Sequence, residues 1–352
     1  MKKVSLTPAV FHLSDSVNSI CQPYAKQPIV PRGPALKPVL ERIRNNIVKL
    51  LDAEDSHETV IFSSSGSGSI AAAMGSCIDE RGVLIIVNDA YGVRQAEFCE
   101  QLGLKTIRYE QEWGNKPDID QIEKLVKLHQ VGTIGMVHGC TSVCLLNPIE
   151  AVGKLCQKLD LRFIVDAIAS IYVEEINLNG WGIDTLICST NKALHSNPDL
   201  SFCVVRKDYL EEMGQKNGGH PFTINIRALL EFEAALNDFE ERGGLVARIK
   251  MYQDRTQILR NGYKNLRLET YQKPGMIQQN IGTALFLPKN VDYQKLADDL
   301  ANWDNGDGES YDIYSAQGKL SDQVFRIFNM GEYSLGTYER FLIALEACLK
   351  RF

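Results

Sequence analysis

The chain has 352 residues, with 44 acidic against 38 basic side chains and a formal net charge of -6 at pH 7. The charges are mixed and form no long run of one sign, so we expect neither nucleic acid nor an anionic membrane surface as a partner. Nine cysteines are an odd number without metal-ligand spacing, which predicts reduced thiols and no metal site.

The first forty residues contain six prolines, at positions 8, 23, 28, 31, 34 and 38. So many prolines exclude a continuous helix or a central strand, and we expect residues 1–45 to form an extended N-terminal arm. The start shows no signal peptide, and no apolar run approaches the roughly 18 to 20 residues of a membrane span. We therefore expect a cytoplasmic protein without membrane contact.

Between about residues 58 and 206, seven short apolar runs alternate with segments of helical pattern. The runs are TVIFSSS, GVLIIVND, LKTIRYE, TIGMVHG, RFIVDAI, DTLICST and SFCVVRK. This alternation predicts an α/β fold with a mostly parallel seven-stranded sheet and helices on both faces. We expect a large domain over residues 46–250, with its ligand outside the carboxyl ends of the strands.

The last third of the chain has a different pattern. Residues 221–260 show apolar positions at helical spacing, which predicts long amphipathic helices. Candidate strands at IGTALFLP and VFRIFNMG precede a candidate helix at TYERFLIALEACLK. We expect a smaller α+β domain over residues 251–352.

The segment IFSSSGSGSIAAAMGS places small hydroxyl and glycine residues between a strand and a helix. The N–H groups and dipole of a helix start favour an anion, so Ser65, Gly66 and Ser67 are candidates for holding a phosphate. An ordinary serine-rich turn with a helix cap is equally consistent with this segment alone.

Two charged residues follow later apolar runs. Asp166 ends RFIVD, where a buried carboxylate needs a cationic partner, although an Asp capping the next helix explains that segment as well. Lys192 lies between two apolar runs, where partial burial would lower its pKa and suit Schiff-base chemistry, and a surface loop lysine is the alternative. One cofactor, pyridoxal 5'-phosphate, requires a phosphate cradle, an acid and an amine together.

With these segments in place, the chain from residue 58 onward resembles the class V, fold-type I pyridoxal-phosphate aminotransferases. The resemblance is nearest to the 2-aminoethylphosphonate:pyruvate aminotransferases, and more distant to those using serine or alanine with glyoxylate. It rests on SSSGSGSIAAAM, NDAYGVRQ, HGCTSVCLLNPI, FIVDAIAS, STNKALHSNPDLSFCVVRK, EERGGLVARIKMYQ and FRIFNMGEYSLGTYERFLIALE.

The resemblance implies a role for individual residues. Lys192 would carry the cofactor as a Schiff base and Asp166 would face its pyridine nitrogen, and these two are the expected catalytic residues. The other expected cofactor contacts are Ser65, Gly66 and Ser67 at the phosphate, Tyr91 stacked on the ring, Thr141 at the phenolic oxygen, and Ser189.

The resemblance also implies a homodimer, in which the neighbouring subunit supplies a phosphate contact through Thr223 and, less directly, His220. Arg326 in FRIFNMG would grip the substrate carboxylate, because a planar guanidinium suits a two-pronged contact. Arg32 is a hypothetical ligand for a phosphonate or second carboxylate, with an exposed arm arginine as the alternative.

The chain departs from the family pattern in several places. Cys140 stands where relatives commonly carry Glu, Ala169 where Ser is usual, and Ile226 where the phosphonate enzymes have Thr. The N-terminal segment reads LTPAVF in place of an LTPGP-like start, and PIVPRGPALK lacks the usual entrance sequence.

The expected reaction moves an amino group from a small donor resembling 2-aminoethylphosphonate to a 2-oxo acid such as pyruvate. A serine or alanine:glyoxylate aminotransferase is the nearest alternative, and a lyase or decarboxylase on the same fold is another, because the fold does not fix the reaction. A third alternative is a non-enzymatic binding or regulatory protein, but the presence of Asp166, Lys192 and Arg326 together favours an enzyme.

Overall fold

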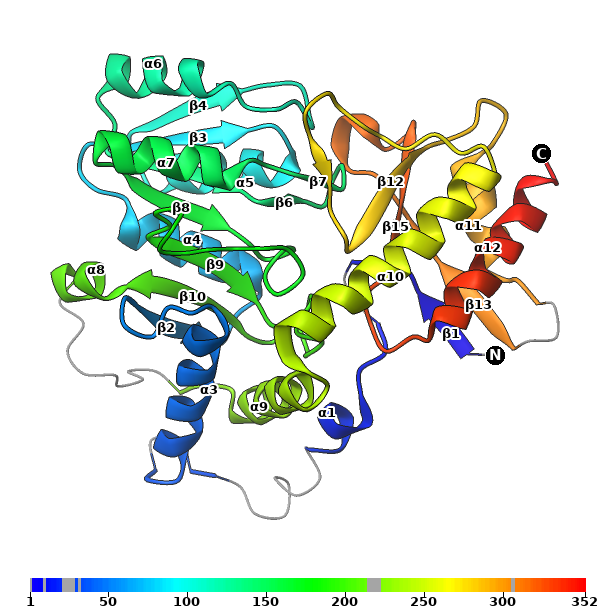
Figure 1. Cartoon of the computed structure of the whole chain (residues 1–352), viewed down its shortest axis with the longest axis horizontal. Helices are drawn as coiled ribbons and strands as arrows, with labels where there is room; N and C mark the ends of the chain where they lie inside the picture. Colours follow the sequence, from blue (N-terminus) through cyan, green and yellow to red (C-terminus); the bar gives the residue numbers. More distant parts are fainter. Residues whose placement is uncertain (1, 9–10, 21–28, 31–32, 214–222, 305–307) are drawn as a thin grey trace.

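The structure is a computed structural model, in which residues 2–8, 11–20, 29–30, 33–213, 223–304 and 308–352 are described. Its largest element is a seven-stranded sheet with the strand order β2-β10-β9-β8-β5-β3-β4 (Figure 1). Strand β10 runs antiparallel to both neighbours, and the other strands share one direction. The strands are β2 (His57–Phe62), β3 (Val83–Val87), β4 (Thr106–Glu110), β5 (Thr133–Val137), β8 (Arg162–Asp166), β9 (Thr185–Ser189) and β10 (Ser201–Arg206). The predicted mostly parallel seven-stranded sheet is confirmed.

The central strands are apolar along their whole length because both faces of the sheet are covered. Successive side chains point to opposite faces: Leu84 and Ile86 of β3 belong to one core cluster, and Ile85 and Val87 belong to another. The first cluster includes residues of α3 (Leu36–Leu50), α6 (Ile119–His129), α7 (Ile149–Leu159) and α9 (Ile226–Glu241). The second includes residues of α4 (Gly66–Cys77), α5 (Ala90–Gln101) and α8 (Lys207–Glu212).

A smaller α+β region follows, as the sequence predicts. Its three-stranded sheet has the order β12-β15-β14, and the first strand of the chain pairs in parallel with β13. Its elements are β12 (Gly282–Phe286), β13 (Glu309–Asp312), β14 (Tyr314–Ser315), β15 (Val324–Phe328), α10 (Gly244–Asn265), α11 (Tyr293–Ala301), α12 (Leu335–Leu349), the 3-10 turn η1 (Gly318–Leu320) and β1 (Lys2–Ser5). The short helix α1 (Asp15–Ser19) packs against α9 of the large region instead (Figure 1). A small sheet of β6 (Gly139–Cys140), β7 (Leu145–Leu146) and β11 (Ile277–Gln278) joins the two regions.

Figure 1 shows the long helix α10 extending from the large sheet toward the smaller one. A third core cluster combines Val4, Leu6 and Phe11 with many residues between 252 and 348. We propose that residues 1–45, 46–250 and 251–352 are the arm, large domain and small domain, with α3 and α10 each continuing across a boundary. Within the described residues, no helix has both the length and the apolar composition needed to cross a membrane.

We expect Phe163→Ala to destabilise the fold strongly. The Phe163 side chain is fully buried in β8, the strand that ends at Asp166, and a cavity there costs about 3–5 kcal/mol of unfolding free energy. The control is Leu128→Ala at a 74% exposed position of α6, which should change stability by less than about 0.5 kcal/mol. Urea unfolding followed by circular dichroism measures both, and equal effects would contradict the assigned core.

Candidate active site

A cavity of about 170 Å³ lies at the carboxyl edge of the parallel strands. The strands β2, β3, β5, β8 and β9 share one direction, so the segments that follow them meet at this edge. Eight residues expected from the sequence line the cavity: Ser65, Gly66, Ser67, Tyr91, Thr141, Asp166, Ser189 and Lys192. The structure therefore brings together segments that lie more than a hundred residues apart in the chain.

Lys192 follows β9, and its side chain is partly buried. Its Nζ donates a hydrogen bond to the carbonyl oxygen of Pro8, in the segment after β1. The pKa of Lys192 is lowered to about 8: burial is the largest cause, the positive charge of Arg326 adds to it, and Asp166 acts in the opposite direction. About a tenth of this amine is therefore unprotonated, and nucleophilic, at pH 7, far more than for an ordinary lysine.

The loop that carries Lys192 is held from the small region. His195 N donates to Lys192 O at 3.1 Å, and the His195 ring shares a hydrogen bond with Glu332 at 2.9 Å. Arg248 of α10 donates to the carbonyl oxygen of Ala193 at 3.1 Å. His195 has a left-handed backbone conformation with φ of 54°, which is found in tight turns and not in regular helices or strands. These contacts fix the position of the amine.

Asp166 is the last residue of β8 and is 3% exposed. Its Oδ1 accepts from Ile168 N at 3.0 Å and its Oδ2 from Gln95 Nε2 at 3.3 Å, and both donors are neutral. The pKa of Asp166 is raised to about 6: burial is the largest cause and Asp89 adds to it, while the hydrogen bonds from Ile168 N and Gln95 act in the opposite direction. A buried carboxylate with only neutral hydrogen-bond donors is well suited to a cationic ligand atom.

The first turn of α4 forms another wall of the cavity. Ser65 is the N-cap residue, but its side chain makes no capping hydrogen bond. A Cβ at Gly66 would lie 2.8 Å from Cδ1 of Ile168, so a larger residue here would force the Ile168 side chain to move. The helix start, with its hydroxyl groups and backbone N–H groups, has the chemistry of an anion site.

Arg94 is a lining residue that the sequence analysis missed. Its guanidinium lies 5.2 Å from the centre of the Tyr91 ring and donates to Ser67 Oγ at 3.4 Å. Asn191 was missed as well, and its Oδ1 accepts from Ser189 Oγ at 2.6 Å. The position of Arg94, three residues after Tyr91 on a helix, was a usable signal, because such residues share a face.

Arg326 lies behind the cavity wall and is not among its lining residues. It is 3% exposed, its Nε and one terminal nitrogen donate to Ser315 O at 3.0 and 2.7 Å, and the other terminal nitrogen donates to Thr141 O at 2.9 Å. A guanidinium has five N–H donors, so one remains on each terminal nitrogen after the contacts found in the described ranges. That pair of donors is what a two-pronged carboxylate contact requires.

The remaining expected site residues lie elsewhere. Thr223 is exposed and does not line the cavity of its own chain. Asn225, two residues later, donates its backbone N–H to Ser63 Oγ at 2.9 Å, close in sequence to the first turn of α4. Arg32 and His220 lie outside the described residues.

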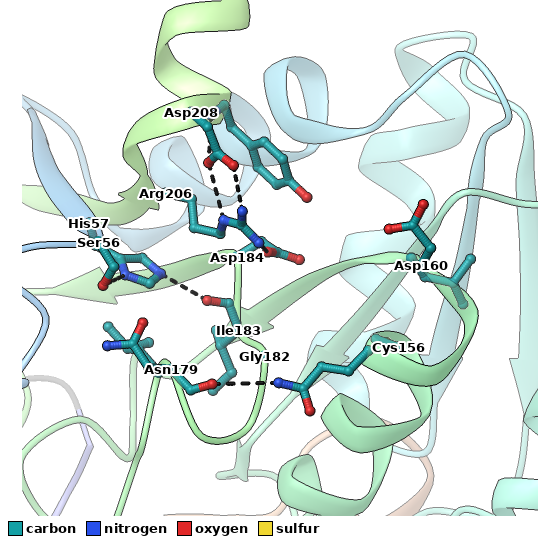
Figure 2. Close-up of a pocket in the computed structure, with 14 residues that line it drawn as sticks. Ser56, His57, Cys156, Asp160, Asn179, Gly182, Ile183, Asp184, Arg206 and Asp208 are labelled. Atoms are coloured by element: carbon teal, nitrogen blue, oxygen red, sulfur yellow. Dashed lines mark hydrogen bonds and ion pairs between the residues drawn. The ribbon is translucent and has the colours of Figure 1, made fainter.

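A second hollow, of about 590 Å³, lies at the opposite edge of the sheet (Figure 2). It contains none of the expected residues, and three of its charged groups pair with one another: Arg206 donates to Asp184 at 3.0 Å and also contacts Asp208. His57 Nε2 shares a hydrogen bond with Ile183 O at 2.9 Å. Figure 2 shows Arg206 directed at Asp184 and Asp208, with Asp160 apart from them. The hollow is larger than the first cavity, but its arginine is already paired with two carboxylates.

The comparison with solved structures places this architecture among known enzymes. An alanine–glyoxylate aminotransferase from Nostoc sp. superposes with a TM-score of 0.85 at 19% identity, covering 99% of this chain and 94% of that one. A ureidoglycine–glyoxylate aminotransferase from Bacillus subtilis gives a TM-score of 0.86 at 22% identity, covering 99% and 92%. The fold is thus fold type I, the architecture of pyridoxal-phosphate-dependent aminotransferases.

The sequence comparisons narrow this class. The model of the family "Aminotransferase class-V" matches residues 31–248, and the chain belongs to this family. The 2-aminoethylphosphonate–pyruvate transaminase of Aeromonas hydrophila is 30% identical over 334 residues, covering 88% of this chain and 86% of that protein. A bifunctional phosphonoacetaldehyde hydrolase/aminoethylphosphonate transaminase of Clostridioides difficile is 28% identical, covering 89% of this chain and 52% of that protein. The resemblance inferred from the motifs is confirmed.

We expect Lys192 to react with a small aldehyde at unusually low pH. Only the unprotonated amine condenses with an aldehyde, so the rate should rise with pH and reach half its maximum near pH 8, against about 10.4 for an ordinary lysine. Cyanoborohydride trapping followed by peptide mass spectrometry measures the rate at this residue. Arg326→Gln removes a repelling charge and should raise the midpoint, and a midpoint of the wild type above about 10 would contradict the described environment.

Proposed function

We propose that the chain is a pyridoxal-phosphate-dependent transaminase that transfers an amino group from a donor of the 2-aminoethylphosphonate type to a 2-oxo acid such as pyruvate. The observation that carries the proposal is the position of Lys192 and Asp166 in one cavity beside the first turn of α4. The names of the relatives support the substrate class.

The residues of the cavity fit the cofactor. Hydroxyl and N–H groups at Ser65, Gly66 and Ser67 suit its phosphate, and Tyr91 offers a ring for stacking. Asp166 supplies the buried carboxylate for the ring nitrogen, and Lys192 the amine for the aldehyde. Thr141 and Ser189 add hydroxyl groups at the side of the ring. When bound, this cofactor supplies an electron sink for the bond that breaks at the substrate carbon.

Lys192 has two tasks in this proposal. Its amine holds the cofactor covalently between turnovers, and after release it takes a proton from the substrate carbon and returns one to the cofactor side. A pKa near 8 suits both tasks, because the amine then accepts and donates protons near neutral pH. The contacts of His195 and Arg248 to the loop keep the amine within reach of the cavity.

Arg326 would bind the acidic group of the substrate. Its two remaining terminal N–H groups form a fork, and the contact with Thr141 O holds that fork against the cavity wall. Burial of the guanidinium excludes water from the contact and strengthens it.

The functional unit would be a homodimer located in the cytoplasm. Thr223 is exposed in the single chain, and a neighbouring subunit that brings its own Thr223 to the cavity would complete the phosphate site. The location is supported by the cysteines: in the described ranges all of them are free thiols, as is usual in a reducing compartment. Cys140, Cys144 and Cys203 are buried, which disfavours a desulfurase with a mobile catalytic cysteine.

Separate half-reactions test the substrate class. The holoenzyme should lose its yellow colour with 2-aminoethylphosphonate and regain it with pyruvate, and respond less to alanine, serine, glutamate or phosphoethanolamine. Lys192→Ala should abolish the exchange by at least about a thousandfold, because both proton transfer and cofactor release depend on this amine. Bleaching by serine or alanine in preference to the phosphonate would shift the assignment to the glyoxylate enzymes, and a fully active Lys192→Ala would overturn the proposal.

Thr223→Ala tests the contribution of the second subunit. Loss of one hydroxyl contact to the phosphate should weaken cofactor affinity about tenfold, with little effect on pyridoxal, which has no phosphate. Fluorescence titration of the apo-protein measures both affinities. The shared phosphate site would be contradicted if Thr223→Ala weakened the affinities for pyridoxal phosphate and for pyridoxal equally. It would also be contradicted if sedimentation analysis showed the wild-type protein to be a monomer.

A further inference from the structure

Helix α5 places a buried amide against Asp166. Gln95 lies one helical turn after Tyr91, so both side chains lie on the face of α5 that is directed at the cavity region. The Gln95 side chain is fully buried, and its Nε2 lies 3.3 Å from Oδ2 of Asp166. No other side chain in the described ranges donates a hydrogen bond to this carboxylate.

The orientation of the Gln95 amide follows from its neighbour. If Oε1 faced Asp166, two hydrogen-bond acceptors would be brought together, so the N–H side must face the carboxylate. This leaves Oε1 buried and, in the part of the chain that is described, without a hydrogen-bond partner.

Other charged and titratable groups also face Asp166. Asp89, just before α5, raises the pKa of Asp166, as does burial, and Lys192 from the segment after β9 lowers it. The buried thiols of Cys140, Cys188 and Cys203 lie close enough to interact with the carboxylate. Against the repulsion from Asp89, the Gln95 amide and the Ile168 N–H stabilise the ionised form by hydrogen bonding.

The two donors use two of the about four lone-pair positions of a carboxylate, so a further N–H can still approach. We propose that Gln95 is a positioning residue: its amide keeps Asp166 ionised and aimed at the ring nitrogen of the cofactor. The inference rests on the proposed function, because the cofactor supplies that nitrogen.

Cofactor binding to the apo-protein tests this role without any turnover. Gln95→Met keeps the length of the side chain and removes the donor, so Asp166 should hold its proton to higher pH. We expect about tenfold weaker affinity for pyridoxal phosphate at pH 7, with the pH midpoint of binding moved upward. Fluorescence titration across pH 5 to 9 measures both quantities.

An analogue of the cofactor separates this role from packing. The analogue has carbon in place of the ring nitrogen, so it cannot pair with Asp166, and wild type and Gln95→Met should bind it equally. Gln279→Met is the matched control, since Gln279 is also fully buried but donates to Cys140 O at 3.4 Å and makes no contact with Asp166. This variant should keep the pH midpoint of the wild type.

Gln95→Leu provides a second variant without a hydrogen-bond donor in case the methionine variant does not fold. Because it also removes the side-chain donor to Asp166, it should raise the pH midpoint about as far as Gln95→Met does. Unchanged midpoints in the variants, or equal weakening for the nitrogen-free analogue, would overturn the role of Gln95. If the wild-type apo-protein did not bind pyridoxal phosphate at any pH, the result would instead contradict the proposed function, on which the inference about Gln95 rests.

Discussion

The common direction of the strands is the constraint on which the site depends. A parallel strand ends at the same edge as its neighbours, so β2, β3, β5, β8 and β9 each deliver their following segment to one cavity. The apolar interior on both faces keeps that edge rigid. At this edge the chain buries an amine and a carboxylate without letting them neutralise each other: Lys192 donates to a backbone carbonyl, and Asp166 accepts from neutral donors. Both groups therefore remain available for a ligand.

The environment lowers the pKa of Lys192 and raises the pKa of Asp166, so that both values move toward 7. Burial is the largest cause in both cases, because it disfavours a charge of either sign. The neighbours then have specific effects: Arg326 repels the ammonium of Lys192, and Asp89 repels the carboxylate of Asp166. One site thus contains a base that is partly free and an acid that is partly held ionised, the pairing that proton transfer next to a charged ring requires.

Much of this arrangement could be predicted from the sequence. Five of the apolar runs that became strands lead into the site, and Asp166 and Lys192 became candidates by that position. Their roles followed from their combination with the phosphate segment and from the family resemblance. The reversed direction of β10 could not be predicted, because a buried strand has the same composition in either direction. The sequence gives no indication of the hydrogen bond from Lys192 to Pro8 O, because every residue has the same backbone carbonyl group. Arg94 and Gln95 were missed although their helical spacing from Tyr91 was visible, whereas the location of Arg326 behind the wall depends on the packing of two distant sheets.

The pairing of β1 with β13 bears on the order in which this protein takes shape during synthesis. Lys2 lies opposite Glu309 and Val4 opposite Tyr311, so residues 309–312 must be synthesised before this two-stranded sheet closes. Because contacts between such distant segments form late, the large sheet can assemble while residues 2–5 still lack their partner. The backbone oxygen that receives the Lys192 hydrogen bond follows directly on that strand, at Pro8. The surroundings of the reactive amine are therefore completed only when β1 and β13, about 300 residues apart in the sequence, pair with each other.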